Sequence, residues 1–278
     1  MRLKNYIYVL IIAMAISGCS SKKYKNISYL QPTTATTDEP SLNIFSPRKT
    51  TLKTPVLIFV HGGNWNSGDK KMYGFVGRNF AKKGITTVIV GYTLSPKTDF
   101  DGMAKQVAKA VEWTKENISK YNGNPEKIYL TGHSAGGHLI ALVGTNTKYL
   151  KDKSIIKGII LNDAAGLDMK HYLQEIPPTE KDSYLKTWSN SPEIWKNASP
   201  IYFLDKNAPP FMIYTGGTKT YRSIQIANER FLKELHQYQP NVKLNVLNKN
   251  HVSMITQYFF PWSNRYDEII NFINSPKL

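Results

Sequence analysis

Short runs of apolar residues recur along this chain, separated by longer segments in which the apolar residues have helical spacing. Continuous runs bounded by proline or glycine, such as Pro55-Val-Leu-Ile-Phe-Val60, are typical of strands buried on both faces of a parallel sheet. Residues 41–47 alternate in polarity before they stop at Pro47, which adds an early strand. The other predicted strands occupy residues 86–92, 127–131, 155–161, 211–215 and 242–247.

The segments between these strands predict helices. The longest of them, residues 101–121, places Met103, Val107 and Val111 on one side. Strands that alternate with helices predict an α/β fold with a doubly wound, mostly parallel sheet covered by helices on both faces. The predicted helices are residues 69–83, 101–121, 223–238 and 266–273, with a further one directly after Ser134.

Residues 165–207 depart from this alternation and predict a small cap or lid inserted into the fold. The segment contains Pro177-Pro178 and an unusual number of aromatic side chains. These are Tyr172, Tyr184, Trp188, Trp195 and Tyr202.

The first residues are not part of the predicted domain. Arg2 and Lys4 precede an apolar run from Tyr6 to Ile16, and small residues follow it up to Cys19. This order is typical of a secretory signal, and the run is too short for a comfortable transmembrane span. We therefore divide the chain into a signal peptide (1–19), a tether and loop (20–40) and one domain (41–278).

Composition narrows the class of protein. The chain has 278 residues, of which 41% are hydrophobic, and this suits one large α/β domain or two small ones. The formal net charge is +16, but there is no dense arginine cluster and no nucleic-acid-binding module. The lysines are spread along the sequence, which predicts a solvated surface with at most a weak attraction to a membrane. Cys19 is the only cysteine, so a disulfide framework is excluded.

The main candidate for chemistry is Gly132-His133-Ser134-Ala135-Gly136, a G-x-S-x-G match. It follows a predicted strand and precedes an apolar helix. A serine hydroxyl is a weak nucleophile, so it must sit on a sharp, exposed turn that a base can reach. The alternative is an ordinary glycine-rich turn.

A second glycine turn, His61-Gly62-Gly63-Asn64-Trp65, follows the strand at residues 55–60. The carboxyl ends of parallel strands are where such sheets place their sites. The backbone N–H groups of Gly63 and Asn64, with that of Ala135, are therefore candidates for an oxyanion hole. Otherwise the segment is only a tight turn.

Together with Tyr92-Thr-Leu-Ser-Pro96, Ala198-Ser-Pro200 and Asn250-His251, these motifs resemble those of α/β-hydrolases. The resemblance is to the hormone-sensitive-lipase-like and kynurenine-formamidase-like esterase group, and it covers most of residues 40–260. It implies the α/β-hydrolase fold, a serine nucleophile at Ser134 and a general base at His251, which follows the last predicted strand.

The segment Ile16-Ser-Gly-Cys19 resembles a bacterial lipobox, which implies cleavage before Cys19 and lipidation of that residue. A plain signal peptide with a chance cysteine is the alternative.

The acid that should orient His251 is missing from its usual place. Related sequences carry it after the strand at residues 211–215, where this chain has no carboxylate and has Lys219 instead. Asp163 and Asp168, which follow the preceding strand, are the candidates. We favour Asp163, which is nearer to the strand end, whereas Asp168 resembles a structural aspartate. A Ser–His dyad or a catalytically weak protein remains open.

The sequence thus predicts a lipid-anchored protein of the bacterial cell envelope that hydrolyses a small-molecule carboxylic ester through Ser134, His251 and Asp163. No metal and no organic cofactor is implied, and the oligomeric state is left open. Hydrolysis of an amide, as in arylformamidases, is the alternative within enzymes. A binding lipoprotein that keeps the fold without catalysis is the alternative outside them.

Overall fold

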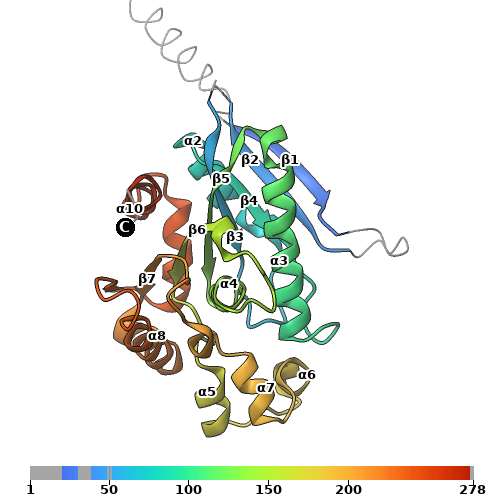
Figure 1. Ribbon diagram of the computed structural model, residues 1–278, viewed down its shortest axis with the longest axis vertical. Coiled ribbons are helices and arrows are strands. Elements are labelled where there is room, and N and C mark those ends of the chain that lie inside the picture. Colours follow the sequence, from blue (N-terminus) through green and yellow to red (C-terminus); the bar gives the residue numbers. More distant parts are fainter. Residues whose placement is uncertain (1–20, 31–38, 49, 51, 276–278) are drawn as a thin grey trace, which may run out of the picture.

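The computed structural model describes residues 21–30, 39–48, 50 and 52–275, which build one eight-stranded sheet between two layers of helices (Figure 1). The strand order is β1-β2-β4-β3-β5-β6-β7-β8. Strand β2 is antiparallel to both of its neighbours, and β3 to β8 run parallel to one another. The bounds are β1 (Ser21–Ser28), β2 (Ser41–Pro47), β3 (Thr54–Val60), β4 (Thr86–Val90), β5 (Gly123–His133), β6 (Ile156–Asn162), β7 (Phe211–Thr215) and β8 (Leu244–Val246).

Two hydrophobic cores lie on the two faces of the sheet. Because side chains alternate along a strand, Ile58 of β3 belongs to the first core and its neighbour Leu57 to the second. The first core is covered by α3 (Phe100–Asn117), α4 (Ala135–Thr145) and α8 (Arg222–Leu235). The second is covered by α2 (Gly74–Lys82), α9 (His251–Thr256) and α10 (Asn264–Asn274). The prediction of a mostly parallel sheet with helices on both faces is confirmed.

The predicted cap is a set of short helices between β6 and β7, at the lower end of the molecule in Figure 1. Not all of its large aromatic side chains are available to contact a ligand. Trp188 is fully buried, packs against Phe100 and Trp65, and so joins the cap to the main core. The helices are α5 (Met169–Glu175), α6 (Tyr184–Trp188) and α7 (Pro192–Asn197).

The N-terminal prediction needs a correction. Residues 20–40 were expected to be a tether and loop, but Ser21–Ser28 form β1, which pairs with β2 along the edge of the sheet. Tyr24 and Ile27 pack against the first core, and this contact explains why the polar segment joins the sheet. The predicted signal peptide and Cys19 lie outside the described residues. No helix among the described residues is both long and apolar enough to span a bilayer.

Candidate active site

Ser134 lies on a sharp turn between β5 and α4. Its φ of 54° and ψ of −122° are a strained backbone conformation, of the kind that projects a nucleophile from such a turn. The flanking glycines are required by packing, since a Cβ at Gly136 would lie 2.1 Å from the carbonyl oxygen of Val60. The hydroxyl therefore stands at the carboxyl end of the sheet, at the N-terminus of α4, where the helix dipole favours negative charge.

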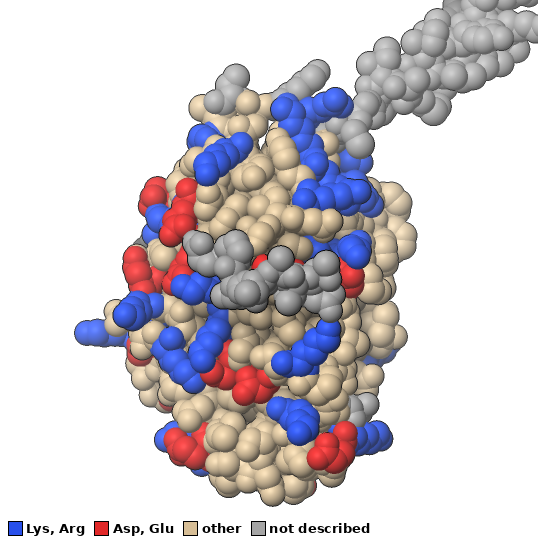
Figure 2. Space-filling view, turned by 90° about the vertical axis from the view of Figure 1, so that its right-hand side faces the viewer, with Lys and Arg blue, Asp and Glu red and all other residues tan. Residues whose placement is uncertain are grey.

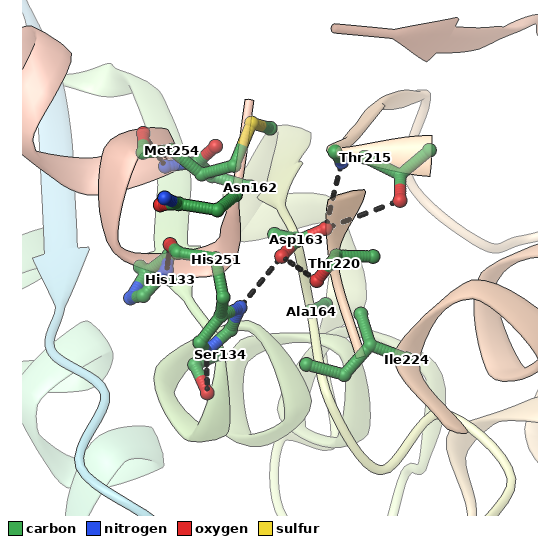
Figure 3. A network of polar contacts seen from close by, with 12 residues as sticks. His133, Ser134, Asn162, Asp163, Ala164, Thr215, Thr220, Ile224, His251 and Met254 are labelled. Atoms are coloured by element: carbon green, nitrogen blue, oxygen red, sulfur yellow. Dashed lines mark hydrogen bonds and ion pairs between the residues drawn. The ribbon is translucent and has the colours of Figure 1, made fainter. Parts of the chain in front are cut away.

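His251 is the first residue of α9, and its ring lies between Ser134 and Asp163 (Figure 3). Its Nε2 is 2.9 Å from Ser134 Oγ, and its Nδ1 is 2.6 Å from Asp163 Oδ2. With the proton on Nδ1, the ring donates to the carboxylate and Nε2 is free to accept the serine proton. The structure thus brings together the three side chains that the sequence nominated.

Asp163 follows β6 and is completely buried. Strand β6 lies between β5 and β7, and His133 at the end of β5 pairs with Asn162 at the end of β6. The turn at Asp163 has a φ of 51°, and its N–H donates to the carbonyl oxygen of Tyr214 at 2.8 Å. The backbone therefore turns the carboxylate toward His251 directly after the strand.

The loop after β7, where a carboxylate was expected and is missing, instead supplies hydrogen bonds to Asp163. The N–H of Gly216 donates to Oδ1 at 2.9 Å, Thr215 Oγ1 donates to Oδ1 at 3.1 Å, and Thr220 Oγ1 donates to Oδ2 (Figure 3). Burial raises the pKa of Asp163, but the hydrogen bonds from His251, Thr220 and Gly216 outweigh it and hold the pKa below its usual value. The carboxylate stays ionised beside the imidazole.

Asp168 has a different environment. Its Oδ1 accepts the N–H of His171 as the N-cap of α5, and its Oδ2 lies 2.8 Å from Nε of Arg230. The side chain is 1% exposed and has no hydrogen bond to His251. Asp168 therefore ties the cap to α8, in line with the structural role that the sequence suggested.

The turn after β3 lies against the nucleophile. A Cβ at Gly62 would lie 2.9 Å from Cβ of Ser134, so the turn passes directly beside the serine. Gly63 has a φ of 128° and Asn64 a φ of 51°. No described residue accepts a hydrogen bond from the N–H of Gly63 or Asn64, and the N–H of Ala135 is among those that a helix leaves unpaired at its start. All three predicted donors therefore remain available for a ligand oxygen.

A cavity of about 510 Å³ opens beside Ser134 and is lined by the oxyanion turn, the cap and α8. Cap residues Tyr172 and Tyr184 line it, whereas Trp188 and Trp195 do not. The carboxylates at its wall are Asp168 and Glu175, and no lysine or arginine of the described chain lines it. The described residues also contain no group of three or more His, Cys, Asp or Glu side chains able to hold a metal ion.

Two buried histidines hold the site in place without carrying charge. Burial, with a smaller effect of His251, lowers the pKa of His133 to about 4, and burial lowers the pKa of His138 to about 4. His138 Nδ1 accepts the indole N–H of Trp65 at 3.1 Å, so its Nε2–H donates to the carbonyl oxygen of Ala198 at 2.7 Å. His133 Nε2 donates to the backbone carbonyl of His251 at 3.0 Å, which fixes the start of α9.

Some supporting residues could not be found from the sequence. Asn162 donates from Nδ2 to the carbonyl oxygen of Met254 at 2.9 Å and so holds α9 against the sheet. Thr215 and Thr220 support the carboxylate. Asparagine and threonine are common in loops, and no spacing rule marks them. The missing acid after β7 pointed to a carboxylate on a neighbouring strand, but nothing in the sequence pointed to these hydrogen-bond donors.

The matching family model covers residues 42–233, more than half of the chain, and is described as BD-FAE. The chain belongs to the BD-FAE family. Its match spans β2 to α8 and includes the serine turn, both aspartates and the oxyanion turn. His251 lies beyond it.

Curated relatives of this BD-FAE protein include esterases and formamidases. Esterase LipC of Mycobacterium tuberculosis is 28% identical over 179 residues, which cover 60% of this chain and 44% of the relative. Kynurenine formamidase of Danio rerio is 37% identical over 166 residues, covering 59% of this chain and 53% of the relative. The chain therefore spans about half the length of the curated relatives it matches.

Solved structures support the same fold. The crystal structure of esterase B from Lactobacillus rhamnosis superimposes with a TM-score of 0.72 and 19% identity, covering 98% of this chain and 92% of the other. At that identity the likeness establishes the architecture only. The expected membership of the α/β-hydrolases, in the esterase and kynurenine-formamidase group, is confirmed.

Proposed function

We propose that this protein is a serine hydrolase that cleaves carboxylic esters through an acyl-enzyme intermediate. The observation that carries the proposal is the continuous hydrogen-bond chain from Ser134 through His251 to the buried Asp163. Three unpaired backbone N–H groups accompany it, beside a cavity large enough for a small-molecule ester.

Acylation begins when Ser134 Oγ attacks the ester carbonyl carbon and passes its proton to His251 Nε2. Asp163 keeps the imidazole in the required tautomer and stabilises the imidazolium that forms. The N–H groups of Gly63, Asn64 and Ala135 bind the oxyanion of the tetrahedral intermediate. When the intermediate collapses, the C–O bond to the alcohol breaks and His251 returns the proton to the leaving oxygen.

Deacylation uses the same groups in the reverse order. His251 accepts a proton from a water molecule, whose oxygen attacks the acyl carbon. The second tetrahedral intermediate is held at the same N–H groups. It then releases the carboxylic acid as Ser134 recovers the proton from His251.

The cavity wall bears on the substrate class. Its aromatic cap residues and its lack of basic side chains among the described residues favour an uncharged ester with an apolar or sugar-linked acyl group over a substrate that carries its own carboxylate. We expect p-nitrophenyl esters of rising acyl length, tested beside acetylated sugars, to give measurable turnover. The chain length at which the rate falls then reports the size of the cavity.

Hydrolysis of an arylformamide is the second candidate. It is supported by the similarity to kynurenine formamidases, one of which is 37% identical over 166 residues. The same chemistry serves both, because the leaving amine also requires a proton from His251. The ratio of kcat/KM for N-formyl aromatic amines to that for aryl esters distinguishes the two.

The direct test of the proposal is Ser134→Ala. The variant should lose ester turnover by a factor on the order of 10³ or more while keeping its fold, because the nucleophile is gone and the strained turn accepts alanine. An active-site fluorophosphonate should label the wild type and not the variant. Unchanged hydrolysis by the purified variant would exclude Ser134 as the nucleophile and would favour a binding role for the cavity.

The proposal extends to location. The order of basic residues, apolar run and Ser17-Gly18-Cys19 supports a lipoprotein of the bacterial cell envelope that is anchored through Cys19. The anchor would leave the domain outside the bilayer, with its substrate supplied from the water phase.

A further inference from the structure

Part of the positive charge gathers at one end of the molecule. We call this end the amino edge: it is where the parallel strands β3 to β7 begin, and it lies opposite the carboxyl ends that carry Ser134 and Asp163. Seen from the side of β1, lysine and arginine side chains crowd the top of the molecule (Figure 2). Basic residues at or beside the amino edge are Lys22, Lys23, Lys53, Lys82, Lys120 and Lys127.

Four acidic groups at or beside the amino edge are engaged elsewhere. Three of them are each bound to one lysine: Glu126 to Lys115, Asp205 to Lys153 and Asp267 to Lys83. Asp152 accepts the N–H of Ser154 and so caps the short helix before β6. Three of these carboxylates thus have a lysine partner of their own, and none of the four forms an ion pair with a lysine of β1.

Lys23 of β1 lies close to Lys25 of the same strand and to Arg78 of α2. Lys22, Lys23 and Lys25 are exposed, and within the described chain neither they nor Arg78 of α2 form an ion pair. Partial burial, with the charges of Lys25 and Arg78, lowers the pKa of Lys23. Like charges held this close favour an anionic partner that relieves their repulsion.

The path of the chain leads to the same edge. Strand β1 runs in the direction of β4, because both are antiparallel to β2, so Ser21 lies level with the start of the parallel strands, opposite Pro47. Cys19 precedes Ser21 by two residues, and two extended residues span at most about 7 Å. This is close to the Debye length of roughly 8 Å at physiological salt. A lipid on Cys19 would therefore hold the lysines of β1 within electrostatic reach of the head groups.

We propose that the amino edge, with Lys22, Lys23, Lys25 and Arg78, docks on an anionic lipid surface and that the catalytic site points away from it. The orientation rests on the lipid anchor proposed above and does not depend on the esterase reaction. Because β1 belongs to the sheet, the anchor leads directly into the folded domain, so its attachment restricts how the domain turns. The cavity then opens to the water phase, and its substrate is a dissolved ester and not a lipid drawn from the bilayer beneath.

The orientation can be measured on the full chain, extracted from bacterial membranes and reconstituted into vesicles. Single dyes are placed through Ser154→Cys, an exposed position before β6 at the amino edge, or through Glu193→Cys, an exposed position on α7 of the cap. The acceptor is a fluorescent lipid head group in phosphatidylcholine vesicles with or without about a quarter phosphatidylglycerol. Transfer from residue 154 should exceed that from residue 193 by roughly twofold or more, only with phosphatidylglycerol, and the difference should vanish at about 1 M NaCl.

Charge reversal tests which lysines are responsible. Lys22→Glu, Lys23→Glu and Lys25→Glu together should abolish the difference, since each lysine near an anionic surface contributes about a fivefold factor in binding. The matched control reverses Lys181, Lys186 and Lys196, three exposed lysines of the cap, and should keep the difference. Turnover of a soluble ester by both triple variants should stay within about twofold of wild type, since none of the six residues belongs to the catalytic site. This shows that both are folded.

The following results would overturn the proposal. Equal transfer from both dyes, or greater transfer from residue 193, would mean that the amino edge does not face the lipid. Equal effects of the two reversals would mean that net charge, and not this edge, is recognised. Dye uptake by the parent chain, whose only cysteine is Cys19, would show an unacylated thiol and remove the anchor. If the protein bound duplex DNA more tightly than the anionic vesicles, and through the same lysines, the partner would be nucleic acid instead.

Discussion

At the scale of single residues, Asp163 explains how the site is complete without an acid after β7. Its carboxylate binds the N–H of Gly216 and the hydroxyls of Thr215 and Thr220, which all lie in or beside the loop that lacks the acid. The acid therefore directly follows β6, and the groups that donate hydrogen bonds to it lie at and after the end of β7. Each oxygen of this buried ion has a partner, as burial of a charge requires.

We expect Asp163→Asn to lower kcat by about a hundredfold or more while leaving KM nearly unchanged. The substitution keeps the size but favours the wrong tautomer of His251 and removes the charge that stabilises the imidazolium. The same change in a serine protease costs about 10⁴ in kcat. The measurement is steady-state hydrolysis of a p-nitrophenyl ester.

Asp168→Asn is the matched control, because it alters a second buried aspartate of the segment after β6 without touching His251. It should cost about 1–3 kcal/mol of stability through the lost ion pair with Arg230, with kcat largely kept. A larger loss of kcat in this variant than in Asp163→Asn would reverse the roles given to the two residues.

The sequence could nominate Ser134, His251 and Asp163 because a motif, a chain order and a strand end mark them. Charge alone could not rank Asp163 above Asp168. Asp163 was favoured because it is nearer to the end of its strand, and because Asp168 resembles a structural aspartate. The hydroxyl donors were beyond reach, because their role depends on how the loop after β7 folds back over β6. Lys219, which occupies the expected place of the acid, is exposed.

At the scale of elements, the cap is connected to the oxyanion turn as well as to the cavity. Tyr184, the first residue of α6, donates its hydroxyl to Oδ1 of Asn64 at 2.9 Å. Its ring also packs edge-on against Trp65 and Trp188. Asn64 has a positive φ and supplies a proposed oxyanion donor, so this hydrogen bond ties the cap to the oxyanion turn.

Tyr184→Phe should therefore reduce kcat by about fivefold, the equivalent of one neutral hydrogen bond of about 1 kcal/mol, with a smaller change in KM. Tyr172→Phe is the control, since Tyr172 lines the same cavity from α5 but has no hydrogen bond to Asn64. Equal effects of the two substitutions on kcat would show that the tyrosines act only as cavity wall.

Elements were predictable where their apolar pattern is strong. Strands β3 to β7 follow continuous apolar runs, and their parallel order follows from the helices between them. Strand β1 was missed because Ser-Lys-Lys-Tyr-Lys-Asn-Ile-Ser offers only two apolar side chains to the core. Helix α9 was missed because six residues are too few for a helical period, although Asn250 caps it by accepting the N–H of Ser253.

At the scale of the whole molecule, the lipoprotein proposal predicts that Cys19→Ser releases the protein from membranes. The acyl chains supply the affinity for the bilayer, and the lysines of the amino edge add only a salt-sensitive part. Cell fractionation followed by a high-salt wash measures the share of the protein that stays with the membranes. A variant that still sediments with the membranes after that wash would show that Cys19 is not the anchor.

The buried histidines make the stability of the whole domain dependent on pH. His133 and His138 have pKa values of about 4 in the folded chain, against the ordinary value of 6.5, chiefly because burial disfavours their charged forms. Below pH 6.5 the unfolded chain therefore binds more protons than the folded one. The stability is complete above pH 6.5 and is lost progressively as the pH falls toward 4.

We expect each of these histidines to cost about 2 kcal/mol of unfolding free energy between pH 7 and pH 5. Urea unfolding at the two pH values measures the loss. In His138→Gln the domain should be less stable at pH 7, because the hydrogen bonds to Trp65 and Ala198 are disturbed. Its further loss toward pH 5 should nevertheless be smaller by about 2 kcal/mol, since glutamine does not titrate. The exposed His236→Gln is the control, and an equal flattening there would show that burial is not the cause.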